Sequence, residues 1–184
     1  GNIIGMQRNK QQITTEPGLQ CELSGAPLEN IHQVCSESSK FLKEIEIASK
    51  GLDVNTVSIG FDPFNNLSDI PQSPKTRYKI MTKEMPKGGK QSLEMMYRTC
   101  GIQINYDYTS EENFEKIFRL GNYLTPLTIA LYSNSPFEAG QPVGYYSYRN
   151  KVWQNTSRGG IMPIAFEKVS FEKYFDHVTK YPML

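Results

Sequence analysis

Two glutamates near the start of the sequence have a spacing that could place both carboxylates on one side of a strand. Glu16, Gln20 and Glu22 are separated by four and two residues, and alternate residues of an extended strand share a face. Carboxylate oxygens suit Mg²⁺, which usually keeps several waters and bridges to the phosphates of a substrate. A regular strand would separate the two carboxylates by about 20 Å, so a bulge at Pro17-Gly18 would have to shorten the path. A solvated sheet face has the same pattern, and the spacing alone favours that interpretation.

A second group of polar residues alternates with apolar ones after a short predicted helix. Gln103, Asn105 and Asp107 would share one face of a strand, and Arg98 precedes them at the end of the helix. Such a strand fits the floor of a wet cleft. An outer, solvent-facing sheet would have the same sequence, so the pattern leaves both interpretations open.

A cation lies among aromatic residues in the segment from Tyr145 to Trp153. Arg149 directly follows Tyr148, and an arginine fork can bind a carboxylate through two parallel hydrogen bonds. Mixed aromatic and basic residues are also typical of platforms that stack single-stranded nucleic acid. The balanced charge of the chain argues against that second function, and core packing of the tyrosines is the commoner explanation for such a segment.

The composition is that of a folded domain without a strong electrostatic preference for a partner. The 184 residues are 38% hydrophobic and carry 20 basic against 19 acidic side chains, for a net charge of +1. This length suits one domain, or one domain and part of another. The charge balance gives no general case for binding nucleic acid or an anionic membrane. Mean hydropathy is −0.50, and no apolar run approaches the roughly 20 residues of a membrane span.

The start of the chain and its cysteines add further expectations. No charged segment followed by an apolar one opens the sequence, so no signal peptide is visible. Gly1 stands where an initiator methionine would be, and we therefore expect the chain to begin inside a longer reading frame or to have been trimmed. Three cysteines, Cys21, Cys35 and Cys100, are a poor disulfide framework and fit a reducing compartment.

Turn residues and hydrophobic periodicity predict an α+β chain with a largely antiparallel sheet. The apolar stripe that follows Pro27 predicts a helix that ends at Gly51. Thr109 and Glu112 have the spacing of a capping box at the start of a long helix, which Pro126 should kink or interrupt. We expect further helices at 77–84, 92–97 and 171–180, and strands at 13–24, 54–61, 101–108, 145–148 and 161–166.

The segment from Glu16 to Gln33, EPGLQCELSGAPLENIHQ, resembles the EPGGQFELSGAPLE signature of the plant-type glutamate–cysteine ligases, which also occur in many proteobacteria. Leu19 stands where that signature has glycine, and Cys21 stands where it has phenylalanine. Further family motifs follow in the same order over essentially the whole chain. They are similar to RYKIM (77–81), MPK (85–87), MMYRTC (95–100), QINYD (103–107), NSPF (134–137), SYRNKVW (147–153) and YPM (181–183) of this sequence.

The resemblance implies a glutamine synthetase-like fold, in which an antiparallel sheet forms a funnel with flanking helices. Residues 1–184 would then be the central part of a single catalytic domain, and the funnel would be incomplete. The implied activity is that of an ATP- and Mg²⁺-dependent C–N ligase. It joins the γ-carboxylate of L-glutamate to the amine of L-cysteine through an acyl phosphate, as the first step of glutathione synthesis. The implied location is the cytoplasm, or a plastid for a plant-like source, and a homodimer is left open.

Functional residues are carried over only where this sequence matches a family motif. Glu16 and Glu22 match metal-site glutamates, and Gln103 lies where related ligases place a polar ligand beside the metal. No nucleophile is assigned, because such a ligase activates its substrate with ATP. The resemblance further implies a set of substrate-binding residues, which are Arg149, Asn105, Asp107, Arg98, Arg77 and Trp153.

Two family motifs have no counterpart in these 184 residues, an N-terminal EHEKF-like motif and a C-terminal EMRGADGGP segment. They would supply a metal-binding or ATP-binding carboxylate and an arginine beside the phosphates. We therefore expect the 184 residues alone to be inactive. Two alternatives stay open, a carboxylate–amine ligase with another amino-acid acceptor and a non-catalytic binding or assembly fragment that keeps the fold.

Overall fold

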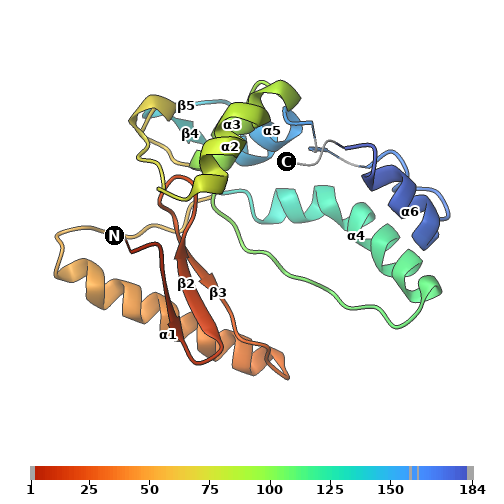
Figure 1. The fold of residues 1–184 in the computed structure, drawn as a ribbon, viewed down its shortest axis with the longest axis horizontal. Coiled ribbons are helices and arrows are strands. Elements are labelled where there is room, and N and C mark those ends of the chain that lie inside the picture. The colour runs from red at the N-terminus through yellow and green to blue at the C-terminus, as the bar shows by residue number, and fades with distance from the viewer. Residues whose placement is uncertain (1–2, 158, 161, 182–184) are drawn as a thin grey trace. The chain divides into compact units, whose positions relative to one another are not determined.

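The computed structural model describes residues 3–157, 159–160 and 162–181 of the chain, which folds into two compact units (Figure 1). The first unit comprises residues 1–58 and 71–78, and the second comprises residues 59–70 and 79–184. Helices occur together with small antiparallel sheets, which confirms the predicted α+β class. The funnel-shaped sheet stays a prediction, and so does the assignment of all 184 residues to one catalytic domain.

An antiparallel sheet with the strand order β1-β2-β3 begins the first unit. Its strands are β1 (Gly5–Arg8), β2 (Gln11–Thr15) and β3 (Cys21–Ser24). Asn9 turns the chain between β1 and β2 with a positive φ of 54°, a conformation that asparagine adopts more readily than most residues. Strand β2 therefore lies in the middle of the sheet and pairs with a neighbour on each side.

The single strand predicted for residues 13–24 is wrong, because the chain reverses direction in the middle of it. Pro17 has no N–H to donate to a strand ladder. The backbone N–H of Leu19 donates to the carbonyl of Glu16 at 2.9 Å, and Leu19 has a positive φ of 61°. The Pro17-Gly18 pair therefore marks a hairpin turn between two strands, where the sequence predicted a bulge in one.

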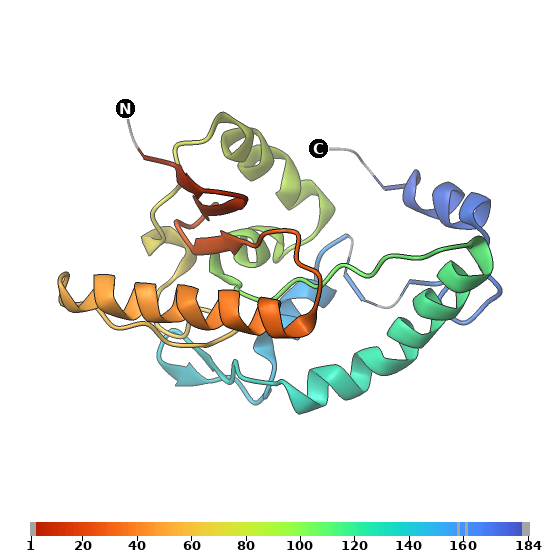
Figure 2. The ribbon, with the colours of Figure 1, turned by 90° about the horizontal axis from the view of Figure 1, so that it is seen from below.

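Helix α1 (Ile31–Lys50) lies along this sheet within the first unit (Figure 2). The side chain of Asn30 caps its start by accepting a hydrogen bond from the backbone N–H of Gln33 at 3.1 Å. The helix ends at Gly51, as the apolar stripe predicts. A long amphipathic helix is thus positioned by local signals that the sequence shows directly.

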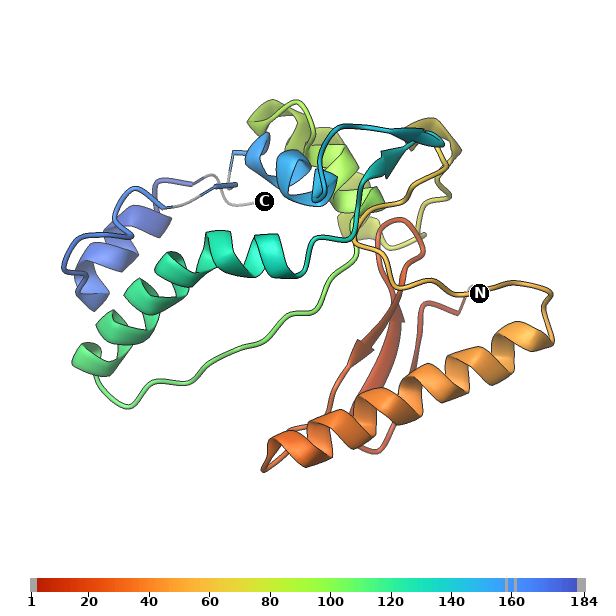
Figure 3. The same cartoon turned by 180° about the vertical axis from the view of Figure 1, so that it is seen from behind.

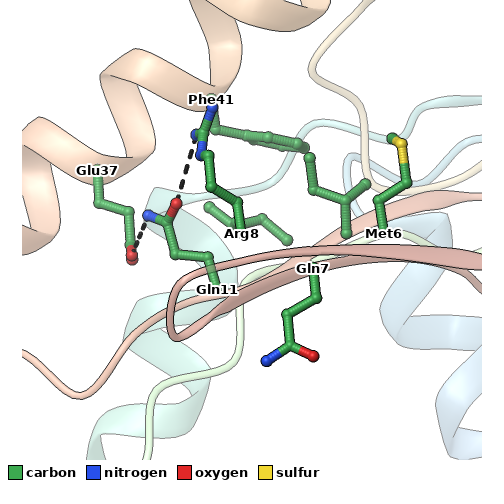
Figure 4. Close-up of a pocket in the computed structure, with 8 residues that line it drawn as sticks. Met6, Gln7, Arg8, Gln11, Glu37 and Phe41 are labelled. Atoms are coloured by element: carbon green, nitrogen blue, oxygen red, sulfur yellow. Dashed lines mark hydrogen bonds between the residues drawn. The ribbon is translucent and has the colours of Figure 1, made fainter.

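A cavity of about 250 Å³ lies between α1 and the sheet (Figure 4). At its rim Arg8 forms an ion pair with Glu44 at 2.8 Å, and Gln11 donates to Glu37. These polar contacts join the first hairpin to the helix. The cavity wall also contains the apolar side chains of Met6, Ile13, Leu23 and Phe41.

The core of the second unit forms where short helices meet. Phe61 and Val152 are fully buried there, and Met96 and Tyr97 are nearly so. Helix α2 begins in the first unit and ends in the second. The elements around this core are α2 (Thr76–Glu84), α3 (Ser92–Arg98), α5 (Tyr148–Gln154), the strand pair β4 (Phe137–Glu138) and β5 (Gln141–Pro142), and the 3₁₀ turns Leu67–Asp69 and Met85–Gly88.

The long helix predicted from Thr109 is confirmed as α4 (Glu111–Leu131). The predicted cap, Thr109, is wrong by one residue: the cap is Ser110, whose hydroxyl accepts a hydrogen bond from the backbone N–H of Asn113 at 3.1 Å. Pro126 lies inside the helix, which continues beyond it, so the proline does not end the element. No helix in the described part of the chain is sufficiently long and apolar to cross a membrane.

The last helix, α6 (Phe171–Val178), lies beside the start of α4 (Figure 3), and aromatic side chains join the two. The ring of Phe114 lies 5.4 Å from the ring of Tyr174 and 5.3 Å from that of Phe171. Phe118 also contacts Tyr174, with 5.6 Å between the ring centroids. These contacts leave Phe114, Phe118 and Tyr174 half-buried between the two helices.

The strand predicted for residues 101–108 is wrong, although its alternation is regular. The segment is extended and exposed, and Ile102 is 92% exposed. An alternating segment becomes a strand only when another backbone pairs with it, and none does so within the part of the chain described here. Figure 3 shows the segment as a single run of chain that leads into α4.

The other predicted strands fail for local reasons. Residues 54–61 contribute only an isolated bridge from Phe61 to Thr99. The aromatic segment 145–148 runs into α5, because the Ser147 hydroxyl caps a helix there. In the segment 161–166, residue 161 lies outside the described residues, and 163–166 form turns.

Candidate functional site

The hairpin of β2 and β3 places Glu16 and Glu22 on one face of the sheet. Glu22 pairs with Thr14, and Glu16 follows Thr14 by two residues, so all three side chains project to the same side. The N–H of Glu16 donates to the carbonyl of Gln20 at 2.9 Å, which extends the pairing to the turn. The chain reversal thus removes the separation of about 20 Å that one regular strand would impose.

Both carboxylate oxygens of Glu16 accept a hydrogen bond from a neighbouring hydroxyl. Tyr78 Oη donates to Oε2 at 2.8 Å, and Thr14 Oγ1 donates to Oε1 at 3.1 Å. Arg77 Nη2 in turn donates to Tyr78 Oη at 3.0 Å. Glu16 is therefore held in one orientation from two sides.

Two cations lie beside this pair of glutamates. Lys75 Nζ donates to the carbonyl of Thr15 at 2.7 Å and lies 5.4 Å from the ring centroid of Tyr78. The Arg77 guanidinium lies over the same ring at 4.8 Å. We call the group Glu16, Glu22, Lys75, Arg77 and Tyr78 the carboxylate face. All five residues belong to the first unit.

The carboxylate face carries charges of both signs, and their balance affects how well the face can bind a cation. Burial raises the pKa of Glu22, the negative charge of Glu16 raises it further, and Lys75 and Arg77 partly offset both effects. Repulsion between two carboxylates is relieved when a divalent cation lies between them. Within the described residues no group of three or more His, Cys, Asp or Glu side chains could hold a metal ion. Two carboxylates nevertheless fit Mg²⁺, because phosphates and waters complete its coordination.

Arg98 lies in the second unit, where the chain's own carboxylates surround it. It is 3% exposed, and its Nη1 lies 2.8 Å from Glu94 and 3.3 Å from Glu138. Its Nη2 donates to the carbonyl of Asp62 at 3.2 Å, and its guanidinium lies over the ring of Phe61 at 4.4 Å. These contacts join α3 to β4. The substrate-binding role implied for Arg98 stays a prediction, and the structure gives the side chain a packing role.

Arg149 has no carboxylate partner among the residues described. Its Nε donates to the carbonyl of Cys100 at 2.8 Å, and its guanidinium lies 5.3 Å from the ring centroid of Trp153. Burial lowers the pKa of this guanidinium. Arg149 therefore does not form an ordinary surface ion pair with any carboxylate in this part of the chain.

Two glycines make room for the Arg149 side chain. A Cβ atom at Gly101 would come within 2.8 Å of Arg149 Nη2, and one at Gly60 would come within 3.1 Å of Arg149 Cδ. The indole N–H of Trp153 is buried and has no acceptor among the described residues. Arg149 and Trp153 together thus keep donor capacity that the described chain does not use.

The remaining predicted site residues lie on the exposed segment before α4. Gln103, Asn105 and Asp107 are all exposed, and they belong to the second unit. Glu16 and Glu22 belong to the first unit. The three-residue metal site with Gln103 therefore stays a prediction.

Sequence reasoning missed the residues that orient the predicted ones. Tyr78 and Thr14 hold Glu16, and Glu94 and Glu138 hold Arg98. Tyr78 lies within the RYKIM motif, in which the family resemblance implies a role only for its neighbour Arg77. The alternation of Thr14 with Glu16 was a usable signal, because residues two apart on a strand share a face.

Comparison with known proteins gives a match over almost the whole chain. The family model described as glutamate-cysteine ligase family 2 (GCS2) matches residues 4–184. The chain is 44% identical to glutamate–cysteine ligase A, chloroplastic, of Oryza sativa subsp. japonica, over 99% of this chain and 38% of that protein. It is 44% identical to the chloroplastic glutamate–cysteine ligase of Nicotiana tabacum and 43% identical to that of Arabidopsis thaliana, covering 35% of each. The chain thus spans less than two fifths of the length of these relatives.

Proposed function

This chain belongs to glutamate-cysteine ligase family 2 (GCS2), and on that premise we propose that the protein ligates L-glutamate to L-cysteine with consumption of ATP. The observation that carries the proposal is the carboxylate face, where the hairpin places Glu16 and Glu22 on one side. Relatives named glutamate–cysteine ligase share 42–44% of their aligned residues with this chain, which supports the same reaction. The names of these relatives place them in the chloroplast, which favours a plastid over the cytoplasm for this protein.

Glu16 and Glu22 would hold Mg²⁺ on the carboxylate face. When bound, Mg²⁺ screens the repulsion between the phosphates of ATP and the incoming carboxylate of glutamate. Thr14 and Tyr78 keep the Glu16 carboxylate in place, and Lys75 and Arg77 add positive charge to the same face. That charge would attract the phosphates of ATP.

Arg149 would bind the carboxylate of one amino-acid substrate through its guanidinium fork. Its lack of a carboxylate partner among the described residues, and the unused indole N–H of Trp153, support this assignment. Asn105 and Asp107, which are exposed on the segment before α4, would contact the same substrates. A bound amine held beside an activated carboxyl group reacts as if within one molecule.

The proposed chemistry has two steps, because a carboxylate is a poor electrophile. A γ-carboxylate oxygen of glutamate attacks the terminal phosphorus of ATP, and ADP leaves with the electrons of the broken P–O bond. The cysteine amine then attacks the carbon of the acyl phosphate, phosphate leaves, and the nitrogen loses a proton. Lys75 and Arg77 would stabilise negative charge on the phosphoryl group during its transfer.

Two alternatives to this function are tested together. One is a ligase that uses a different amine acceptor, and the other is a non-catalytic fragment of the fold, which the limited span of the chain suggests. The test uses the protein purified as its full natural chain, with ATP, Mg²⁺, glutamate and either cysteine or another amino acid. Phosphate and dipeptide are measured together. The proposal expects both products with cysteine, in equal amounts. Faster dipeptide formation with another amine would show that this amine, and not cysteine, is the acceptor. If no phosphate forms with any amine, the proposed ligase activity is contradicted.

A further inference from the structure

We infer that Tyr78 is a positioning residue that keeps the Glu16 carboxylate open for a divalent cation and keeps Arg77 from pairing with it. The inference rests on the proposed function, because it assumes that Glu16 and Glu22 hold a cation. It adds a residue that does not itself contact the metal. Tyr78 is 2% exposed, and its hydroxyl lies between Arg77 and Glu16.

The direction of these two hydrogen bonds follows from the groups involved. An arginine N–H can only donate and a carboxylate can only accept, whereas a phenol does both. Arg77 therefore donates to Tyr78 Oη at 3.0 Å, and Tyr78 Oη donates its single proton to Glu16 Oε2 at 2.8 Å. The other oxygen of Glu16 accepts from Thr14 at 3.1 Å. Each carboxylate oxygen keeps a lone pair that can bind a cation.

Backbone contacts fix the phenol relative to the hairpin. The N–H of Ser73 donates to the carbonyl of Pro17 at 2.9 Å, and Lys75 Nζ donates to the carbonyl of Thr15 at 2.7 Å. The N–H of Tyr78 donates to the carbonyl of Lys75 at 3.0 Å. These bonds bind the segment before α2 to the turn that contains Glu16.

The phenol also keeps a cation away from Glu16. Arg77 Nη2 donates to Tyr78 Oη, so its guanidinium approaches Glu16 through an intervening oxygen. Without that oxygen Arg77 could pair with the carboxylate directly, and such a charge-assisted bond would compete with a metal ion. Loss of the Tyr78 hydroxyl should therefore weaken metal binding in two ways. The Glu16 carboxylate becomes free to rotate, and Arg77 can pair with it in competition with the metal ion.

The test measures binding of Mn²⁺ alone to the full natural chain, from the electron paramagnetic resonance signal of free Mn²⁺. Tyr78→Phe removes only the hydroxyl, and we expect it to raise the Mn²⁺ dissociation constant about 10- to 100-fold. Tyr97→Phe is the matched control, because that tyrosine is also buried but its hydroxyl bonds Thr82. We expect Tyr97→Phe to bind Mn²⁺ as the wild type does.

Glu22→Gln separates a failure of this inference from a failure of the proposed metal site. If Glu22→Gln and Tyr78→Phe both bind Mn²⁺ like the wild type, both the proposed metal site and the positioning role of Tyr78 are wrong. If Glu22→Gln loses binding and Tyr78→Phe does not, only the role of Tyr78 is overturned. Should Tyr78→Phe fail to fold, Tyr78→4-fluorophenylalanine fills the volume of the hydroxyl without a proton to donate. The same loss of affinity is then expected, and wild-type affinity overturns the inference.

Discussion

Glu22 lies directly opposite Thr14 in the antiparallel pairing of β2 with β3, on the face from which Glu16 also projects. This relationship depends on the reversal of the chain between the two glutamates. A turn of five residues, from Glu16 to Gln20, therefore determines whether two carboxylates can share one cation.

Leu19 should carry strain in this turn, because its φ of 61° lies in the left-handed region that favours glycine. A residue with a side chain pays about 1–2 kcal/mol for that conformation. We expect Leu19→Gly to be about 1 kcal/mol more stable than Leu19→Ala, since both lose the leucine side chain and only glycine relieves the strain. Urea unfolding of the two variants measures the difference. A less stable glycine variant would contradict the left-handed turn.

Helices and strands differ in how far the sequence could predict them. The apolar stripes of α1 and α4 lie within each helix, and α1, α4 and α6 appear close to the predicted ranges, although the cap of α4 is Ser110 and not Thr109. Strand formation needs a second backbone, so the alternation at 101–108 could not show that no described segment pairs with it. The turn at Pro17 also shows how one proline pattern fits both a bulge and a hairpin.

The candidate site was predictable where its residues lie close together in the sequence. Glu16 and Glu22 share a face, as their even spacing indicates. The hydrogen bond from Tyr78 to Glu16 joins residues 62 positions apart, and no local pattern reports such a contact. The same holds for Glu138, which reaches Arg98 across 40 positions.

Arg149→Lys should raise the KM for glutamate or for cysteine about 10-fold, with a smaller effect on the KM for ATP. Lysine keeps the charge but loses the planar fork, and a hydrogen bond to a charged group contributes about 1.5–3 kcal/mol. Steady-state kinetics of the full natural chain give these values. Arg119→Lys is the control, because Arg119 is an exposed side chain that pairs with Glu115 one turn earlier in the same helix. Unchanged amino-acid KM values and kcat in Arg149→Lys would show that Arg149 does not bind substrate.

Arg98→Gln should destabilise the fold by about 3 kcal/mol, because it leaves two carboxylates facing a buried site without their cation. Arg98 is 3% exposed and contacts Glu94 and Glu138. Chemical denaturation measures the loss. Lys116→Gln removes an exposed partner of Glu112, and we expect it to destabilise the fold far less than Arg98→Gln does. Equal effects of the two substitutions would mean that Arg98 does not hold α3 against β4.

Stability at alkaline pH should depend on Tyr148. Burial, and then its hydrogen bond to Glu138, raise the pKa of Tyr148 from 10.0 to about 12. The folded state therefore holds this proton more tightly than the unfolded state does. The resulting stability is complete below pH 10 and is lost as the pH rises toward 12. We expect the wild type to lose stability relative to Tyr148→Phe over that interval.

Urea unfolding at several pH values measures this dependence. Tyr146→Phe is the control for the loss of one hydroxyl, because Tyr146 is 85% exposed. Its stability should follow that of the wild type at every pH. A wild type that keeps a constant stability difference from Tyr148→Phe between pH 10 and 12 would show that the fold does not retain this proton.

Turnover of the Glu22→Gln variant at limiting Mg²⁺ tests the central claim most directly. The substitution keeps the shape of the side chain and removes the charge that would hold the cation opposite Thr14. We predict that ATP-dependent formation of the glutamate–cysteine dipeptide falls at least about 10- to 100-fold, while circular dichroism shows an intact fold. Wild-type turnover by Glu22→Gln at limiting Mg²⁺ would contradict the assignment of this face to metal-dependent ligation.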